Sequence, residues 1–546
     1  MKQIYCVVLL LLATIVALSS QNQMDLITAI YGEFNNDLFG LHLLAMDFNG
    51  DGYDDLIVKS DRWNNTGIYD SEYRPGKIYF YWGGPDFDNI PDFVLEGQWH
   101  QHYGGNYSSS QLCNAGDMNG DGIDDLAIIS SYDTIWGYPK SIDLFLGSSN
   151  PQTVPDYTIT YPDTMVEPRA LGDINGDGKA DLGIMGYYNS PRAPFCYIWT
   201  DLESDPVLFR SMTGGGLIYL TGVGDINNDG YDDTYLTLPI DPTQPHEKRA
   251  VLYYGDGAAS MSDSLVISDN IPDGRSNARP LGDINGDGFD DFIGYHDFDY
   301  HYIWLGSADL SPLPSLGISQ FSDHHDMHYF ALGGGNYATY GDFNGDAYDD
   351  FVCSDSEANG YNGQAGVWLG GQNVNATVDL VLNPPSDWQW RNFGYSKAMG
   401  DFNGDGLCDL ALSCTWWGTQ DFWDPGRVYV YAGNTQLQDT TVSVDDPVAP
   451  SLGQDQWKLN VYPNPCAKND GSIGIALQGE GYTRSGEYSY KLYNIRGQMI
   501  QQGRISSAEM KSTQFKLLFK GLSAGIYRIT VLKNGKVTGS KKVIFM

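Results

Sequence analysis

The segment DFNGDGYDD at Asp47–Asp55 decides the fold, because it returns six more times in nearly the same form. Its pattern is Asp-x-Asn-x-Asp-Gly-x-x-Asp, and the other copies begin at Asp117, Asp173, Asp225, Asp283, Asp342 and Asp401. One such match is a weak signal, whereas seven copies in nearly fixed register indicate a repeat protein.

Each copy places oxygen-bearing side chains at positions 1, 3, 5 and 9. Ca²⁺ takes about six to eight oxygen ligands from carboxylates, amides, backbone carbonyls and water. The residue at position 7 is the expected backbone carbonyl donor, and the Gly at position 6 permits a tight turn with positive φ. We therefore predict one calcium site in each copy.

The predicted calcium ligands occupy positions 1, 3, 5, 7 and 9 of the seven copies. They are Asp47, Asn49, Asp51, Tyr53 and Asp55; Asp117, Asn119, Asp121, Ile123 and Asp125; Asp173, Asn175, Asp177, Lys179 and Asp181; Asp225, Asn227, Asp229, Tyr231 and Asp233; Asp283, Asn285, Asp287, Phe289 and Asp291; Asp342, Asn344, Asp346, Tyr348 and Asp350; and Asp401, Asn403, Asp405, Leu407 and Asp409.

Three alternatives to a calcium site fit the sequence less well. An EF-hand needs a Glu at position 12 and flanking helices, but Val58 and Ile128 stand there and strand-like runs follow. Turns built by Asp and Asn without an ion would leave three carboxylates repelling one another. Mg²⁺ prefers octahedral sites that keep several waters. The sixth copy carries Ala347 in place of Gly, which predicts a strained or weaker site.

Successive copies start 70, 56, 52, 58, 59 and 59 residues apart, a length that suits propeller blades of four strands. A second signature, a strand running into Gly, follows each loop by about twenty residues. It reads GKIYFYWGG in the first repeat and GRVYVYAG in the last, and only the third copy lacks the Gly.

These repeats resemble the FG-GAP repeats of integrin α-subunit propellers and their bacterial relatives. The Phe-Gly signature survives as LFG at Leu38–Gly40 and NFG at Asn392–Gly394, and the resemblance covers roughly residues 24–435. It implies an all-β, seven-bladed β-propeller in which each calcium loop joins the first and second strands of a blade.

The two ends of the predicted ring share one blade. The segment DLITAIYG at Asp25–Gly32 resembles a fourth strand whose other three strands are missing, and the last repeat has only three. We expect the N-terminal strand to complete the seventh blade, because closure removes free sheet edges. A rival closing strand is DTTVSV at Asp439–Val444.

Residues outside the ring predict export. Residues 1–19 have the composition of a secretory signal peptide, too short to span a membrane, and no other stretch predicts a transmembrane segment. The predicted propeller spans residues 24–440, a linker spans residues 441–456, and a separate domain spans residues 457–546. Residues 456–546 hold 14 basic and 4 acidic residues, which leaves 17 basic and 65 acidic residues in the rest.

The tail resembles the C-terminal sorting domain of the type IX secretion system of Bacteroidota. Its ordered landmarks are LNVYPNP, YKLYNIRGQMI, GLSAGIYRITV and a terminal KKVIFM. The resemblance implies a small Ig-like β-sandwich that is recognised by the type IX secretion machinery, with release or surface attachment afterwards. An ordinary Ig-like module is the alternative.

Strand alternation places the calcium loops and the loops between third and fourth strands at one end of the ring. The loops at the other end are rich in aromatic residues, which supply rigid contact area in binding sites. The same residues could instead cap the hydrophobic ends of blades. The candidate ligand-face residues are Trp63, Tyr69, Tyr132, Trp136, Trp416, Trp417 and Trp423.

The net charge of −38 argues against a nucleic-acid partner, which needs a basic surface. The leading hypothesis is a secreted or surface-attached, calcium-binding recognition module for a glycan or protein. A polysaccharide-active enzyme and a passive surface protein are the alternatives. No catalytic motif stands out from the predicted calcium ligands, so no catalytic residue is predicted.

Overall fold

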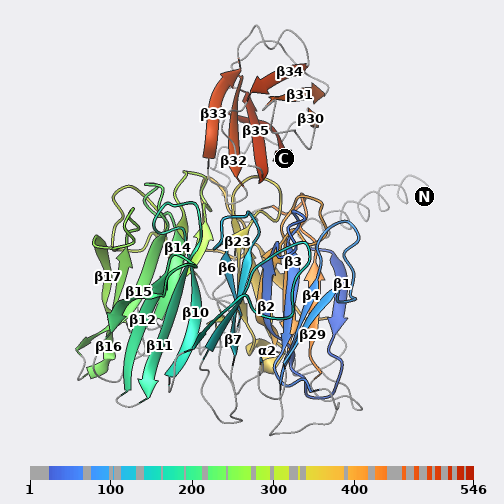
Figure 1. Ribbon diagram of the computed structural model, residues 1–546. Coiled ribbons are helices and arrows are strands. Elements are labelled where there is room, and N and C mark those ends of the chain that lie inside the picture. Colours follow the sequence, from blue (N-terminus) through green and yellow to red (C-terminus); the bar gives the residue numbers. More distant parts are fainter. Residues whose placement is uncertain are drawn as a thin grey trace, which may run out of the picture. The chain divides into compact units, whose positions relative to one another are not determined.

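The computed structural model describes residues 24–64, 75–97, 103, 112–130, 141–160, 164–189, 192–211, 219–241, 244–271, 278–295, 301–318, 330–331, 340–385, 392–415, 425–438, 458–462, 472–478, 488–494, 499–505, 514–518, 525–533 and 536–545 (Figure 1). The chain divides into two compact units, Met1–Thr441 and Val442–Met546. Both are built from antiparallel strands, and the one helix in the described residues is the short α2 (Ala358–Tyr361).

The first unit contains seven antiparallel sheets, numbered here in chain order. The first has the order β2-β3-β4-β5 (Phe39–Met46, Asp55–Ser60, Lys77–Tyr81, Phe93–Glu96), and the second has the order β6-β7-β8-β9 (Leu112–Gly116, Asp125–Ser130, Ser141–Phe145, Tyr157–Thr160). The third is β10-β11-β12-β13 (Thr164–Gly172, Asp181–Asn189, Arg192–Trp199, Val207–Ser211), and the fourth is β14-β15-β16-β17 (Tyr219–Gly224, Asp233–Asp241, Gln244–Tyr253, Ser264–Ile271).

The remaining three sheets follow the same plan. The fifth is β18-β19-β20-β21 (Arg279–Gly282, Asp291–Tyr295, His301–Trp304, Leu316–Gly317). In the sixth, β22 (Phe330–Ala331) and β23 (Tyr340–Gly341) both pair with β24, and the order continues β24-β25-β26 (Asp350–Asp355, Gln364–Trp368, Leu380–Leu382). The seventh is β27-β28-β29-β1 (Phe393–Gly400, Asp409–Cys414, Arg427–Tyr431, Leu26–Tyr31).

The seventh sheet is completed by the N-terminal strand, as the sequence predicts. Strand β1 pairs antiparallel with β29, with Ile30 opposite Val428 and Tyr31 opposite Arg427. The rival segment at residues 439–444 lies outside the described residues. A strand from the start of the unit thus binds the last repeat through backbone hydrogen bonds.

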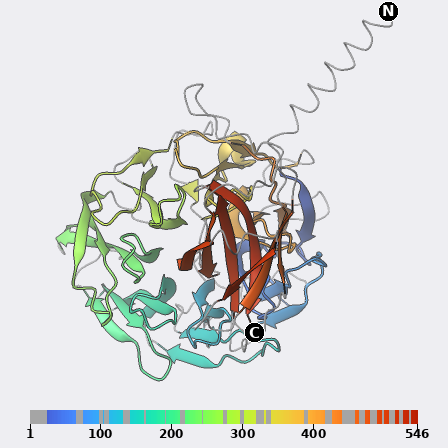
Figure 2. The same cartoon turned by 90° about the horizontal axis from the view of Figure 1, so that it is seen from above.

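The first strands of neighbouring sheets contact one another around a closed circuit. Strand β2 contacts β6, β6 contacts β10, β10 contacts β14, β14 contacts β18, β18 contacts β23, β23 contacts β27, and β27 contacts β2 again. Figure 2 shows the sheets of this unit arranged around a common centre. Each predicted calcium loop therefore connects the innermost strand of a sheet to the next strand outward.

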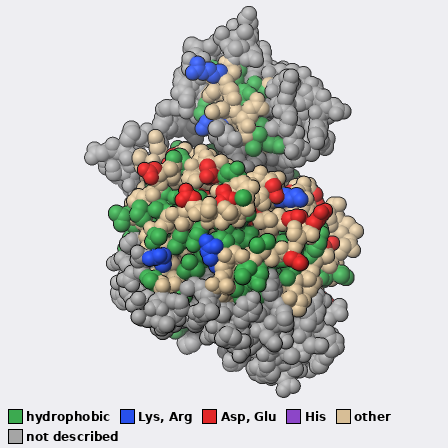
Figure 3. All heavy atoms as spheres, turned by 60° about the vertical axis from the view of Figure 1, so that its left-hand side comes forward, with side chains coloured by type: hydrophobic (Ala, Val, Ile, Leu, Met, Phe, Trp, Pro, Cys, Tyr) green, Lys and Arg blue, Asp and Glu red, His purple; other side chains and the backbone are tan. Residues whose placement is uncertain are grey.

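The hydrophobic core lies between neighbouring sheets. One cluster joins Ile30 and Val428 of the seventh sheet to Phe39 and Leu56 of the first, all at most 2% exposed. Second strands such as β3 are buried along their whole length, whereas fourth strands such as β9 and β13 are mostly exposed. In Figure 3 acidic side chains of this unit lie toward one edge, and hydrophobic side chains lie across the middle.

The second unit contains two antiparallel sheets. One has the order β30-β31-β34 (Lys458–Tyr462, Ser472–Gln478, Gln514–Leu518). The other has the order β33-β32-β35-β36 (Met499–Ile505, Tyr488–Asn494, Gly525–Lys533, Lys536–Phe545). The predicted landmarks YKLYNIRGQMI and GLSAGIYRITV include residues of the paired strands β32 and β35.

Candidate functional site

The Asp at position 1 organises each loop by accepting backbone N–H groups. In the first copy, Asp47 Oδ1 accepts hydrogen bonds from Gly50 (2.8 Å) and Asp51 (3.1 Å), and Oδ2 accepts one from Gly52 (2.8 Å). Asn49 Oδ1 in turn accepts the N–H of Asp51 at 2.8 Å. These bonds hold the residues at positions 1, 3 and 5 in one tight turn.

The residue at position 6 has positive φ in every copy, which explains the Gly found there in six of them. The six glycines have φ between 86° and 96°. Ala347 takes the same place in the sixth copy with φ 77°, and its N–H still reaches Asp342 Oδ2 at 3.0 Å. This copy therefore keeps the loop geometry, although Ala347 adopts a backbone conformation that L-residues disfavour.

The Asp at position 9 is a buried anchor that links the loop to the third strand. Asp55 is fully buried; its Oδ2 accepts the N–H of Phe48 (3.0 Å), and its Oδ1 accepts that of Gly83 (2.9 Å). The equivalent Oδ1 bond is made to Gly147, Gly255, Gly306, Gly370 and Gly433. A Cβ on Gly83 would lie 2.2 Å from the carbonyl oxygen of Asp54. This explains why the third strand runs into Gly in six of the seven repeats.

Burial, with a smaller contribution from neighbouring carboxylates, raises the pKa of the loop's buried carboxyl groups. Burial is the main cause for Asp47, and neighbouring Asp51 and Asp124 add to it, so its pKa rises to about 7. Burial together with Asp47 and Asp51 raises the pKa of Asp55 to about 8. Because each carboxylate disfavours ionisation of the others, a bound cation would stabilise the charged form of the whole loop.

The donor set fits a hard divalent cation. Positions 1, 3 and 5 offer carboxylate and amide oxygens without sulfur or imidazole ligands, the set that suits Ca²⁺ or Mg²⁺. In the described part of the chain, no three Asp, Glu, His or Cys side chains form a ready metal-binding group. The Asp side chains of the loops accept N–H groups of their own turns instead.

A further carboxylate, at position 8, connects neighbouring sheets. Asp232 Oδ2 accepts the N–H of Asp173 in the third sheet at 2.7 Å, and Asp54 Oδ2 in the first sheet accepts that of Asp401 in the seventh at 2.8 Å. Asp290 and Asp349 make the same bond to Asp225 and Asp283. We call this bond, between the position-8 carboxylate and the first loop residue of the preceding sheet, the inter-sheet clasp.

Where the clasp forms, the residue before the loop that donates to it is Gly, which leaves room for the carboxylate. A Cβ on Gly172 would lie 2.0 Å from Asp232 Oδ2, and a Cβ on Gly224 would lie 2.3 Å from Asp290 Oδ2. The sequence pattern treated position 8 as variable and therefore missed this group. The available signal was the co-occurrence of Asp at position 8 in five copies with Gly before the loop in six.

Backbone hydrogen bonds reinforce the same joints. The position-8 N–H donates to the position-1 carbonyl of the preceding sheet from Asp124, Ala180, Asp232, Asp290, Asp349 and Cys408. The end of the ring that carries the predicted calcium loops, which we call the calcium-loop end, is therefore a ring of contacts between sheets as well as a set of seven separate turns.

The Phe-Gly signature connects sheets at the opposite end. Phe39 forms an isolated parallel bridge with Gly426, and its N–H donates to Pro425 O at 3.0 Å. Phe393 makes the equivalent bridge with Gly363. A Cβ on Gly426 would lie 2.1 Å from the carbonyl oxygen of Phe39, so Gly is required where the two backbones meet.

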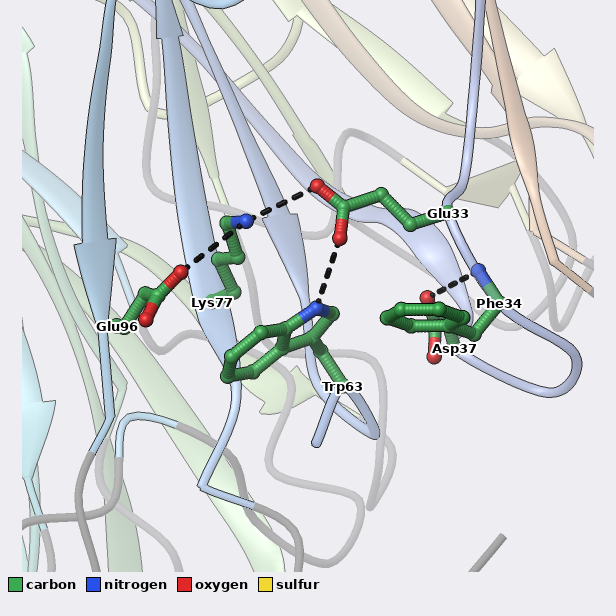
Figure 4. Close-up of polar contacts among 6 residues, drawn as sticks. All are labelled: Glu33, Phe34, Asp37, Trp63, Lys77 and Glu96. Carbon is green, nitrogen blue, oxygen red and sulfur yellow. Dashed lines mark hydrogen bonds and ion pairs between the residues drawn. The ribbon is translucent and has the colours of Figure 1, made fainter. Parts of the chain in front are cut away.

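A polar cluster at the same end fixes the turn from the seventh sheet to the first (Figure 4). Lys77 Nζ lies 2.9 Å from Glu33 Oε1 and 3.3 Å from Glu96 Oε1. It also lies 4.9 Å from the centre of the Trp63 ring. Glu33 Oε2 accepts the indole N–H of Trp63 at 3.1 Å. Asp37 accepts the N–H of Phe34 at 2.8 Å, which closes the turn.

Trp63 is the only predicted ligand-face residue among the described residues. It is 4% exposed, so its ring has little surface to offer a ligand, and it supports the frame around Lys77 instead. The other predicted ligand-face residues, Tyr69, Tyr132, Trp136, Trp416, Trp417 and Trp423, lie outside the described residues. All the predicted loop ligands lie inside them.

Comparison with known families matches two parts of the chain. Residues 39–81, which include the first loop and strands β2 to β4, match the FG-GAP repeat model. Residues 460–546 match the model of the secretion system C-terminal sorting domain. Both resemblances expected from the sequence are thus confirmed. In the described residues, no helix is long and apolar enough to cross a membrane.

Individual relatives match the repeat region. Integrin alpha-5 of Xenopus laevis is 31% identical over 241 residues, which cover 44% of this chain and 18% of the integrin. Integrin alpha-PS2 of Drosophila melanogaster is 28% identical over 177 residues, covering 30% and 12%. The T-cell immunomodulatory protein homolog of Plasmodium falciparum is 26% identical over 276 residues, covering 44% and 36%. The chain thus spans less than a fifth of the length of these integrins. It combines FG-GAP repeat sequence similar to that of integrin α chains with a secretion system C-terminal sorting domain, which implies secretion or a place at the cell surface.

Proposed function

We propose that this chain is a secreted or surface-attached protein whose first unit is a seven-bladed, calcium-binding β-propeller that recognises a glycan or a protein. The observation that carries this proposal is that the two ends of the ring have different kinds of contact between sheets. At the calcium-loop end the same hydrogen bonds recur from sheet to sheet. The opposite end carries contacts that differ between sheets, which is typical of a recognition surface on a repeat scaffold.

Calcium has a structural role in this proposal. The side chains at positions 1, 3 and 5 and the carbonyl at position 7 would hold the ion, and position 9 adds its charge. The ion would neutralise the raised-pKa carboxyl groups and stiffen the turn between the first two strands. The same loops would then stiffen the joints between sheets.

Melting of the full chain with calcium and after chelation tests this role. We expect chelation to lower the melting temperature by several degrees, because a ligand bound only to the folded state stabilises it by mass action. Titration calorimetry gives the number of ions. An unchanged melting temperature together with no measurable calcium binding would refute the calcium assignment.

The recognition role places ligands against the aromatic loops at the end opposite the calcium loops. Glycan-array and cell-surface binding by the intact chain should fall at least tenfold in Trp416→Ala and Trp417→Ala. Trp82→Ala is the matched control, because Trp82 follows strand β4 at the calcium-loop end and is only partly buried. Equal binding by all three variants would contradict recognition at the aromatic end.

The second unit serves export in this proposal. Its two sheets, of three and four strands, are compatible with a small Ig-like sandwich, and its sequence matches the sorting-domain model. Removal of residues 460–546 should retain the protein inside the cell envelope of a type IX secreting host. Undiminished appearance of the truncated chain in the medium would contradict this assignment.

A further inference from the structure

The inter-sheet clasp is distributed unevenly around the ring. It is present between the seventh and first sheets through Asp54, and it joins the third to the fourth, the fourth to the fifth and the fifth to the sixth sheets through Asp232, Asp290 and Asp349. The three other junctions have a different arrangement, and two of them flank the second sheet.

Between the first and second sheets, the position-8 carboxylate accepts a hydrogen bond from a side chain of its own sheet. Met46 precedes the first loop, where six other copies have Gly, and its side chain is buried in the core between these two sheets. Asp124 Oδ2 instead accepts Asn114 Nδ2 of its own sheet at 3.2 Å. Two backbone bonds remain at this junction, from Asp124 N to Asp47 O at 3.2 Å and from Ser148 N to Phe48 O at 2.9 Å.

Between the second and third sheets, the carboxylate is missing from the sequence. Ala180 stands at position 8, and a Cβ on Gly116 would lie 2.5 Å from its Cβ. The space before the second loop therefore exists, but a methyl group faces it. The backbone bond from Ala180 N to Asp117 O, at 2.8 Å, holds this joint at the calcium-loop end.

The third junction without the clasp lies between the sixth and seventh sheets, which are joined by a side-chain hydrogen bond and a β-bridge instead. Cys408 stands at position 8 beside Gly341. Here Lys397 Nζ of the seventh sheet lies 3.0 Å from Ser354 Oγ of the sixth, and the Phe393–Gly363 bridge joins the same two sheets. The second sheet thus differs from the others in lacking the clasp on both of its sides.

We propose that the second sheet, β6 to β9, is the built-in opening point of the ring, where neighbouring sheets separate first. The proposal rests on the side-chain hydrogen bonds between sheets, not on the identity of a cation or ligand. Opening at this sheet leaves the N-terminal closure intact, because that junction has both the clasp at Asp54 and the Phe39–Gly426 bridge.

Hydrogen–deuterium exchange of the full chain in one calcium-containing buffer tests the proposal. Peptides that cover β6 and the loop from Asp117 should exchange at least tenfold faster than the equivalent peptides of the fourth and fifth sheets, which start at Asp225 and Asp283. Equal protection of all sheets, or fastest exchange at the fourth or fifth sheet, would overturn it.

Two variants test whether the inter-sheet clasp determines where hydrogen exchange is fastest. Ala180→Asp restores the sequence of the other copies and should install the clasp on Asp117, slowing exchange of β6 and its loop at least threefold. Asp290→Ala removes a clasp and should speed exchange of the loop from Asp225 by a similar factor, while leaving β6 unchanged. If Ala180→Asp does not fold, the Asp290→Ala comparison decides alone. Unchanged local exchange in the folded variants would show that the clasp does not set where the ring opens.

Discussion

The two ends of the ring are built by different rules. At the calcium-loop end, a buried Asp at position 9 ties its loop to the Gly after the third strand in six of the seven sheets. At the other end, the Phe-Gly bridge occurs at Phe39 and Phe393, and the Lys77 cluster belongs to the first sheet alone among the described residues. The hydrogen bonds that recur from sheet to sheet at the calcium-loop end hold the ring together. The contacts at the other end differ between sheets, so that end can vary without loss of the ring.

The comparison predicts that equivalent positions at the calcium-loop end have equal effects. Asp350→Ala leaves the N–H groups of Phe343 and Gly370 without their acceptor, and Asp291→Ala does the same for Ile284 and Gly306. Each buried donor left unsatisfied costs about 1–3 kcal/mol, so each variant should lose roughly 3–5 kcal/mol of unfolding free energy in urea titrations.

An exposed carboxylate on the same end is the matched control. Asp88 lies in the turn after β4 and accepts the N–H of Ile90, and Asp88→Ala should cost about 1 kcal/mol or less. Losses that differ by more than about 2 kcal/mol between the Asp350 and Asp291 variants would break the view that this end is a repeated structural unit.

The pH dependence of stability should show the titration of Asp37, which lies in the turn between β1 and β2 at the end opposite the calcium loops. Burial raises the pKa of Asp37 to about 7; Glu33 also raises it, while the Phe34 N–H and Lys77 lower it. Between about pH 4 and pH 7 the folded chain therefore holds a proton on Asp37 that the unfolded chain has released. The free energy of unfolding of the chain consequently falls as pH rises through this range.

Asp37→Asn stays neutral and can still accept the Phe34 N–H. The two proteins should be similar at pH 4, and the variant should become more stable by up to about 4 kcal/mol as pH rises above 7. Urea unfolding at a series of pH values measures the difference. Parallel curves for the two proteins would mean that Asp37 does not titrate across this window.

Ala347→Gly tests the strain in the one loop that departs from the repeat. Gly adopts φ near 77° without the cost that Ala carries there, so the variant should gain about 1 kcal/mol. Gly406→Ala in the seventh loop, where φ is 91°, should lose a similar amount in the same urea titration. A loss of stability in Ala347→Gly would contradict strain as the reason for Gly at position 6.

The smallest effect is expected at the Lys77 cluster. Glu33→Gln keeps an acceptor for the Trp63 indole but removes the charge beside Lys77. Because Glu33 is 39% exposed, the loss should be about 1 kcal/mol or less, and added salt should reduce the difference from the native chain. A loss as large as that of Asp350→Ala would make this end as important for holding the ring as the repeated end.

Much of the fold could be predicted because each repeat encodes its own local structure. The loop pattern, the strand after it and the Gly after the third strand all lie within about thirty residues of one another, so their period was visible. The pairing of β1 with β29 was also predictable, since the N-terminal segment is a fourth strand without its first three and the last repeat lacks its fourth. Trp63 could not be placed, because its burial depends on Glu33 and Lys77 from other segments.

The sequence by itself determined the number of repeats, the oxygen-rich character of the loops and the presence of a sorting tail, because these depend on residues close together in the chain. Tertiary structure decided what the position-8 carboxylates do. Their partners lie 59, 65, 66 and 347 residues away, in the neighbouring sheet. No local pattern specifies such a bond, since it forms only when the ring brings a carboxylate of one sheet against a backbone N–H of the preceding sheet.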